Sequence, residues 1–187
     1  MDIFESNREA WNEEVKRKNY WTLITSEERI LKAKQGMPEI RITPHRNVPL
    51  QWLSGLRDKK VLNACGGGGQ QTPILAAFGC RLTTLDLSDA QIEQDRKALD
   101  KYSLEAELVN GNVLDMPFDD ASFDAVIIPP ALNFVDDLAK AYCQVHRVLR
   151  RGGIFMTGIA NPIIYAFDDR VQEKRLKMKY TIPFSDT

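Results

Sequence analysis

Four consecutive glycines, Gly66–Gly69, follow a short apolar run in the segment VLNACGGGGQQTPILAAFG. Because glycine has no Cβ, the backbone can turn sharply there and a ligand can lie against the main chain. A helix is expected to begin near Thr72 and Pro73, so the glycines would connect a strand to a helix. Open α/β sheets bind ligands at such positions, although a tight turn without a ligand is an alternative interpretation.

Asp86 ends the next strand-like run, RLTTLDL, 17 positions after Gly69. A carboxylate at this position can accept hydrogen bonds from both hydroxyl groups of a nucleoside ribose. The alternative is that Asp86 only caps the following helix. Ser88 and Gln91 already have the spacing of a capping box, which favours ribose binding for Asp86.

A third segment, NGNVLDMPFDDASFDAVIIPP, is rich in turn residues and leads into an apolar strand. Together with the glycine segment and Asp86 it resembles the class I S-adenosylmethionine-dependent methyltransferases. Residues 60–159 carry this resemblance in order, since HRVLRRGGIF is similar to the family's passage into the fifth strand. The strings GGGGQQTPILAAFGC, NPIIYAFDD and IPFSD resemble a narrower, uncharacterised bacterial branch.

The resemblance implies S-adenosylmethionine as cofactor, with the glycine loop at its methionine moiety, an acid at its ribose and a further acid at its adenine. The cofactor-binding residues expected in this chain are Cys65, Gly66, Gly67, Asp86, Leu87, Gln91, Asn112, Val113 and Pro129. Asn63 and Asn112 stand where the family usually has aspartate. An asparagine carbonyl can still accept a hydrogen bond from the adenine amino group, but negative charge near the sulfonium is lost. No catalytic residue is assigned.

Strand-like and helix-like runs alternate after residue 60, which predicts a parallel sheet. The expected strands are VLNA, RLTTLDL, AELV, FDAVII and GIFMTGI, separated by helical runs such as DAQIEQDRKALDKY and VDDLAKAYCQVHRVL. In the last helix Leu138, Tyr142, Val145 and Leu149 share one face, and Gly152 and Gly153 are expected to end the helix. The predicted fold class is a Rossmann-like α/β domain with five parallel strands and helices on both faces.

The chain is expected to form a single domain, residues 1–187, with a helical cap (1–56), a cofactor-binding core (57–160) and an incomplete C-terminal segment (161–187). Helices are predicted at residues 7–18, 26–35 and 50–56, the second with a capping box from Thr25 to Glu28. The aromatic residues Trp11, Tyr20 and Trp21 are interpreted as packing residues. In methyltransferases N-terminal helices cover the ligand, so a lid is an alternative for Tyr20 and Trp21.

Class I domains have two further strands after the fifth, which form an antiparallel edge. After residue 160 only KMKYTIPF resembles a strand, so the chain is expected to be truncated. The fifth strand would then have an open edge near Ile154, Phe155 and Ile159. Such an edge favours self-association.

Composition limits the classes of partner. With 25 Lys and Arg against 26 Asp and Glu, the net charge of -1 indicates neither nucleic acid nor anionic membrane as a partner. No apolar run approaches the ~18 residues of a membrane span. Cys65, Cys80 and Cys143 lack the spacing of a zinc site, so no metal is expected, and reduced thiols suit a cytoplasmic protein.

The sequence therefore predicts a methyltransferase with an unidentified acceptor, expected to be a small molecule. One alternative is a non-catalytic nucleoside-binding or interaction module derived from a truncated methyltransferase. A nicotinamide-dependent oxidoreductase is less favoured, because neither Gln71 nor Thr72 supplies the small third residue of GxGxxG.

Overall fold

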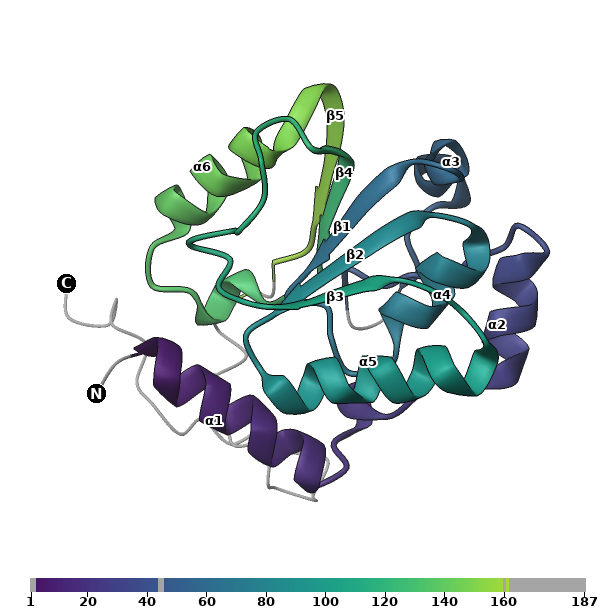
Figure 1. The fold of residues 1–187 in the computed structure, drawn as a ribbon, viewed down its shortest axis with the longest axis horizontal. Helices are drawn as coiled ribbons and strands as arrows, with labels where there is room; N and C mark the ends of the chain where they lie inside the picture. Colours follow the sequence, from purple (N-terminus) through teal and green to yellow (C-terminus); the bar gives the residue numbers. More distant parts are fainter. Residues whose placement is uncertain (1–2, 44–45, 160, 162–187) are drawn as a thin grey trace, which may run out of the picture.

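A five-stranded parallel sheet forms the centre of the protein, in the order β3-β2-β1-β4-β5 (Figure 1). The computed structural model describes residues 3–43, 46–159 and 161. The strands are β1 (Lys60–Ala64), β2 (Arg81–Asp86), β3 (Glu107–Asn110), β4 (Phe123–Ile128) and β5 (Leu149–Thr157). Between them run the helices α4 (Gln71–Phe78), α5 (Asp89–Tyr102) and α6 (Leu138–Val148). The predicted Rossmann-like α/β class with five parallel strands is confirmed.

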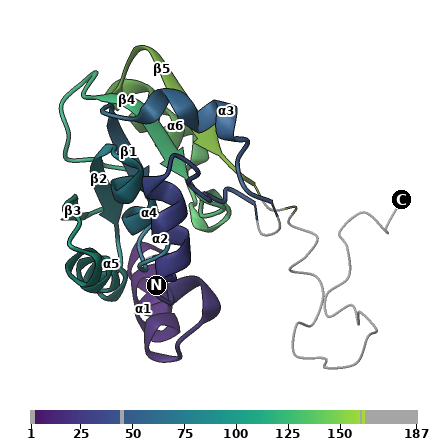
Figure 2. The ribbon, with the colours of Figure 1, turned by 90° about the vertical axis from the view of Figure 1, so that its right-hand side faces the viewer.

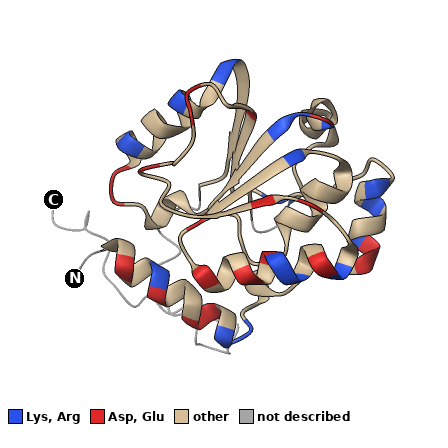
Figure 3. Cartoon of the chain, viewed as in Figure 1, with Lys and Arg blue, Asp and Glu red and all other residues tan. Residues whose placement is uncertain are grey.

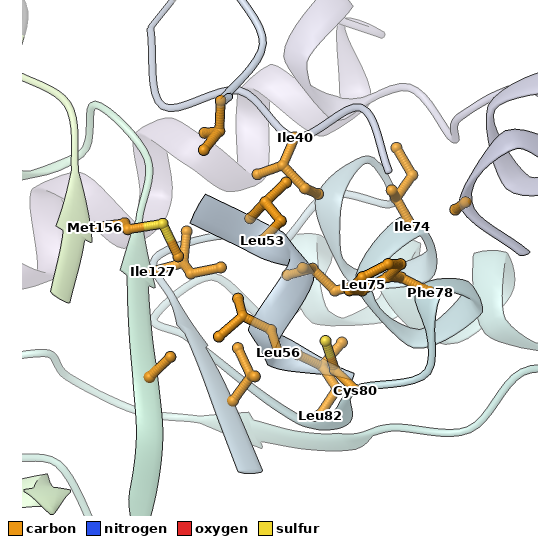
Figure 4. Packing of buried hydrophobic residues seen from close by; sticks show 14 of the residues in the cluster. Ile40, Leu53, Leu56, Ile74, Leu75, Phe78, Cys80, Leu82, Ile127 and Met156 are labelled. Atoms are coloured by element: carbon orange, nitrogen blue, oxygen red, sulfur yellow. The ribbon is translucent and has the colours of Figure 1, made fainter. Parts of the chain in front are cut away.

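Successive strand residues point to opposite faces of the sheet, which therefore contributes to two apolar clusters. On one face Val61, Ile127 and Met156 pack with residues of α4. Figure 4 shows Ile127 and Met156 in this cluster with Ile74, Leu75 and Phe78 of α4. On the other face Leu62 and Val126 pack with residues of α6. Helices therefore cover both faces. Strands β1, β2 and β4 are buried along most of their length, whereas the residues of the edge strands β3 and β5 are mostly half-buried or exposed.

The N-terminal segment forms α1 (Ile3–Lys16), the 3-10 turn η1 (Tyr20–Thr22), α2 (Glu27–Lys34), α3 (Leu50–Leu53) and the 3-10 turn η2 (Ser54–Leu56). Figures 1 and 2 show α1 lying alongside α5. Ile30 and Ala33 of α2 are buried in the same apolar cluster as Ile74 of α4. Helices α2 and α3 are thus part of the packed core on one face of the sheet, whereas α1 has no buried residue.

The predicted capping box of Thr25 and Glu28 is wrong. Ser26 is the N-cap of α2, and it forms no side-chain capping hydrogen bond. The Ser88 cap is confirmed, since its hydroxyl oxygen accepts a hydrogen bond from the Gln91 amide at 3.1 Å. Helix α2 begins at Glu27, one residue later than the capping box required, so Ser26 rather than Thr25 precedes its first residue.

The predicted end of the last helix is also wrong. Helix α6 ends at Val148, and both Gly152 and Gly153 lie inside β5, which begins at Leu149. The pairing of β4 with β5 shifts register between Phe123 and Ala125. An irregular ladder accommodates glycines inside a strand, so here they mark a bulge rather than a helix stop.

The apolar face of α6 is turned from the predicted one. Its buried residues are Ala141, Val145 and Val148. Leu138 and Tyr142 are 42% and 39% exposed, and the Tyr142 ring packs edge-on against Phe155. Ala141, Val145 and Val148 pack in the apolar cluster on this face of the sheet, and Leu138 and Tyr142 are not among its buried members.

Within the described residues β5 pairs only with β4, and Ile154 of β5 is 45% exposed. The expected truncation and the strand-like run KMKYTIPF concern residues outside those described. Self-association through this edge therefore stays a prediction.

Acidic and basic side chains both occur along α1, α2 and α5 (Figure 3). No helix in the described ranges is long and apolar enough to cross a membrane.

Candidate functional site

A cavity of about 650 Å³ lies at the carboxyl ends of β1, β2, β3 and β4, and we call it the central cavity. Strands β1 and β4 are neighbours in the sheet although β2 and β3 separate them in sequence. Open α/β sheets bind ligands at this kind of switch point. All the cofactor-binding residues expected from the sequence line the cavity: Cys65, Gly66, Gly67, Asp86, Leu87, Gln91, Asn112, Val113 and Pro129.

Each of the four positions Gly66–Gly69 favours glycine, either because a Cβ would lie too close to a neighbour or because φ is positive. A Cβ on Gly66 would lie 2.1 Å from Oδ1 of Asn63, and one on Gly67 would lie 3.0 Å from Oδ2 of Asp86. Gly68 and Gly69 have φ angles of +107° and +83°, in the left-handed region that favours glycine. The loop backbone can therefore lie directly against Asn63, which is fully buried, and against Asp86, which lines the cavity.

Asp86 is fixed by the backbone around it. Its Oδ2 accepts a hydrogen bond from the Gly67 amide at 3.1 Å, and its Oδ1 accepts one from the Ser88 amide at 3.0 Å. Burial raises the pKa of Asp86 from 3.8 to about 6, although these amide hydrogen bonds act in the opposite direction. The carboxyl is thus held in place at the cavity wall and is ionised above about pH 6.

Asn63 explains one departure from the family pattern. Its Nδ2 donates to the carbonyl of Gly66 at 3.0 Å and to the hydroxyl of Thr72 at 3.2 Å. A carboxylate has no proton to donate and would face the Gly66 carbonyl oxygen unfavourably. The amide therefore stabilises this glycine loop in a way that an ionised aspartate could not.

Asn112 lies in the turn after β3, where its Oδ1 accepts a hydrogen bond from the Leu114 amide at 2.8 Å. An amide oxygen has two lone pairs, so it can accept a second hydrogen bond from a ligand. The neighbouring Val113 is buried and packs in the apolar cluster of the α6 face. The turn is thus held from within and still presents Asn112 to the cavity.

A buried carboxyl below the glycine loop was missed by the sequence analysis. Asp95 Oδ1 accepts a hydrogen bond from the Gly69 amide at 2.6 Å, and its Oδ2 accepts one from the Thr72 hydroxyl at 2.8 Å. Burial raises its pKa from 3.8 to about 8. Asp95 lies three positions after Ile92 and four before Leu99, on the apolar face of α5, which was the available signal.

The Cys65 thiol is no candidate nucleophile. Burial, followed by the negative charge of Asp86, raises its pKa well above the usual range of a thiol. The reactive form of cysteine is the thiolate, so a thiol held protonated is inert. In the described part of the chain, no cluster of three or more His, Cys, Asp or Glu side chains gathers to hold a metal ion.

Helix α1 covers the cavity and is attached at both sides. Asn7 Nδ2 donates to the Phe134 carbonyl at 2.7 Å, and Asn12 Oδ1 accepts a hydrogen bond from the Ser88 hydroxyl at 2.7 Å. The ring of Trp11 meets that of Phe134 edge-on, with centroids 6.0 Å apart. The sequence analysis interpreted Trp11 only as a packing residue, but it also lines the cavity.

The segment between α1 and α2, residues 17–26, contacts the glycine loop. The Thr25 amide donates to the Gly69 carbonyl at 2.9 Å, and Gln70 Nε2 donates to the Tyr20 carbonyl at 2.5 Å. Trp21 lines the cavity, whereas Tyr20 is not among the lining residues and is 58% exposed. The lid alternative thus suits Trp21 but not the side chain of Tyr20.

Comparison with known proteins identifies the family. Residues 62–157 match a protein family described as "Methyltransferase domain". The chain belongs to this methyltransferase family. Its parallel sheet and Rossmann-like fold make it a class I member, and the match favours this class over the nicotinamide-dependent oxidoreductases.

The relatives include proteins of very different total length. The chain is 38% identical over 182 residues to the uncharacterized methyltransferase YbaJ of Bacillus subtilis, covering 96% of this chain and 71% of YbaJ. It is 32% identical over 130 residues to a sterol 24-C-methyltransferase of Candida albicans, covering 68% of this chain but only 34% of that enzyme.

Among solved structures, a putative S-adenosyl-L-methionine-dependent methyltransferase from Methanococcus maripaludis has a TM-score of 0.57 to this chain. The two are 18% identical, and the match covers 88% of this chain and 68% of the other. At this identity the likeness concerns the fold alone.

Proposed function

We propose that the central cavity binds S-adenosylmethionine and that the chain transfers its methyl group to a small-molecule acceptor. The observation that carries this proposal is the gathering of the expected cofactor-binding residues, which follow the ends of four strands and include Gln91 of α5, around one cavity. Its volume of about 650 Å³ falls within the range of ~300–1,000 Å³ typical of small-molecule sites.

The residues fit the cofactor's chemistry. Asp86 presents carboxylate oxygens that can accept hydrogen bonds from ribose hydroxyls, and Asn112 presents an amide oxygen that can accept from an adenine amino group. Gln91 Oε1 is buried and has no hydrogen-bond partner in the described part of the chain. Gly66 and Gly67 have no side chain, so their backbone itself lines the cavity beside these groups, where a methionine moiety would lie.

The cofactor, when bound, supplies a methyl group on a sulfonium that is already a good leaving group. The chain's own contribution is then to position both reactants and to exclude water. Trp11 of α1 and Trp21 of η1 line the cavity, and so does Pro129, which directly follows β4. No side chain is assigned as a general base.

Nucleotide choice provides the first test. Isothermal titration calorimetry should show binding of S-adenosylhomocysteine, the demethylated product, and this binding should be unaffected by micromolar NAD or NADP. The physical reason is that the loop has no small third residue to accommodate a pyrophosphate beside the following helix. Displacement of S-adenosylhomocysteine by micromolar NAD would instead support the oxidoreductase alternative.

The pH dependence of binding follows from Asp86. Its pKa is raised to about 6, so the carboxylate is present above that pH and is lost as the pH falls through 6. A protonated carboxyl loses acceptor capacity toward the ribose hydroxyls. Affinity for S-adenosylhomocysteine should therefore fall about tenfold between pH 7 and pH 5, because one proton must be displaced on binding.

Calorimetry of the wild type and of Asp86→Asn across this pH range checks that expectation. The amide variant has no carboxyl to titrate, so its affinity should be weak and nearly constant. Asp95, with a pKa raised to about 8, stays protonated over the same range and should not contribute. A wild-type affinity that does not change between pH 5 and pH 7 would contradict the role of Asp86.

A further inference from the structure

Two arginines line the central cavity on the side of α2. Arg29 belongs to α2 itself, and Arg41 lies in the extended segment that follows that helix. Neither residue was singled out by sequence. Both come from the N-terminal part of the chain, outside the segment 62–157 that matches the family.

The hydrogen-bond donors of the Arg29 guanidinium are not all paired within the described part of the chain. Its side chain is 20% exposed, and its Nη2 donates to the carbonyl of Glu39 at 2.7 Å. Its Nε lies 3.5 Å from Oε2 of Glu39 but is buried without a hydrogen-bond partner in the described part of the chain. Burial, and after it the charge of Arg41, lowers the pKa of Arg29, yet a guanidinium remains charged in proteins.

Arg41 is even less constrained. Its Nε donates to Oδ1 of Asn47 at 3.2 Å, and among the described residues no carboxylate lies within ion-pair distance of it. Glu39, the carboxylate that pairs with Arg29, also forms an ion pair with Lys32 at 3.0 Å. Lys32 also pairs with Glu28, at the same distance.

The carboxylates near the two arginines are already engaged. Glu39, which pairs with Arg29, is shared with Lys32, and Glu28 pairs with Lys32 and is 76% exposed. Of these groups only Arg29 and Arg41 line the cavity, so among the described residues Arg41 has no carboxylate partner of its own at this wall. Guanidinium groups bind carboxylates through paired N–H donors, with a geometry that a point charge such as lysine does not provide.

We propose that Arg29 and Arg41 form a carboxylate-binding subsite in the wall of the central cavity. This inference rests on the proposed function, because it adds a ligand group to the same cavity. The carboxylate can come from two sources, which share this chemistry: the methionine moiety of the cofactor, or an acidic acceptor. A variant of either arginine would lose affinity for the cofactor in the first case and for the acceptor in the second.

Calorimetry of Arg41→Gln with two ligands separates the sources. If the subsite binds the cofactor, the variant should lose about 10- to 100-fold in affinity for S-adenosylhomocysteine but nothing for its decarboxylated analogue. If it binds the acceptor, affinity for S-adenosylhomocysteine should be unchanged. Binding of benzoate, an acidic probe with an apolar ring, to the S-adenosylhomocysteine-loaded protein should then be present in the wild type and lost in the variant.

Two further variants keep the test sharp. Arg29→Gln should reproduce the pattern of Arg41→Gln. Arg17→Gln serves as a matched control, because that side chain, directly after α1, is 72% exposed and is not among the lining residues. Arg41→Lys keeps the charge without the paired donors and should lose less affinity than Arg41→Gln.

Two results would overturn the subsite. One is wild-type affinity of both glutamine variants for S-adenosylhomocysteine and for benzoate. The other is an equal loss of affinity for S-adenosylhomocysteine and its decarboxylated analogue, which indicates a structural effect. A wild type that does not bind S-adenosylhomocysteine at all would be a different outcome, since it would contradict the proposed function itself.

Discussion

Replacing Asp86 with alanine should weaken the binding of S-adenosylhomocysteine by about 1.5–3 kcal/mol, or roughly 10- to 150-fold, at pH 7. The carboxylate lies in the wall of the cavity and is held by the amides of Gly67 and Ser88. Hydrogen bonds from ribose hydroxyls to a charged acceptor are among the stronger ones, so their loss has a large effect. Calorimetry on the two proteins measures the difference.

The matched control is Asp100→Ala, an exposed carboxylate on α5 far along the helix from the cavity. It should bind like the wild type. Because Asp86 also accepts two backbone hydrogen bonds, the stability of Asp86→Ala must be measured in parallel by chemical denaturation. A folded Asp86→Ala protein with unchanged affinity would remove Asp86 from the site.

Replacing Gly66 with alanine should destabilise the fold by about 1–3 kcal/mol, the cost of overpacking a tight interior. The new Cβ would lie 2.1 Å from Oδ1 and 2.4 Å from Cγ of Asn63. Asn63 is fully buried and donates hydrogen bonds to the Gly66 carbonyl and to Thr72, so it has little freedom to move aside. The midpoint of denaturant-induced unfolding measures the change.

Gly55→Ala is the matched control, because no heavy atom lies within 4 Å of the position its Cβ would take. That variant should unfold at nearly the same denaturant concentration as the wild type. Equal midpoints for Gly66→Ala and Gly55→Ala would show that the backbone near Gly66 gives way easily. The close approach of the loop to Asn63 would then not be a requirement of the fold.

Local sequence patterns predicted the sheet well where both ends of a strand were marked. The run FDAVII coincides with β4, Phe123–Ile128, because acidic turn residues precede it and two prolines follow it. The run AELV begins and ends one residue earlier than β3, Glu107–Asn110, because the residues that flank this strand are less distinctive. The predicted helical run ended at Leu149, one residue beyond α6, but Gly152 and Gly153 were wrongly assigned as the helix stop. A glycine pair also suits a bulged strand, and only the pairing of β4 with β5 distinguishes the two.

The cavity residues after the strands could be predicted, because the topology of a parallel sheet brings strand ends together whatever the details of packing. Asp86 and Asn112 meet in this way. Trp11, Arg29 and Arg41 could not be predicted, since their positions depend on how the N-terminal helices pack over the sheet. That packing rests on contacts such as that of Asn12 with Ser88, which span 76 positions of sequence.

A crystal structure of the chain with S-adenosylhomocysteine bound is the most direct test of the proposed cofactor site. The ribose hydroxyls should lie within hydrogen-bond distance of the Asp86 carboxylate, with the adenine beside Asn112 and Val113 and the amino-acid moiety along Gly66 and Gly67. S-adenosylhomocysteine bound outside the central cavity, or with its ribose away from Asp86, would contradict the proposed binding site.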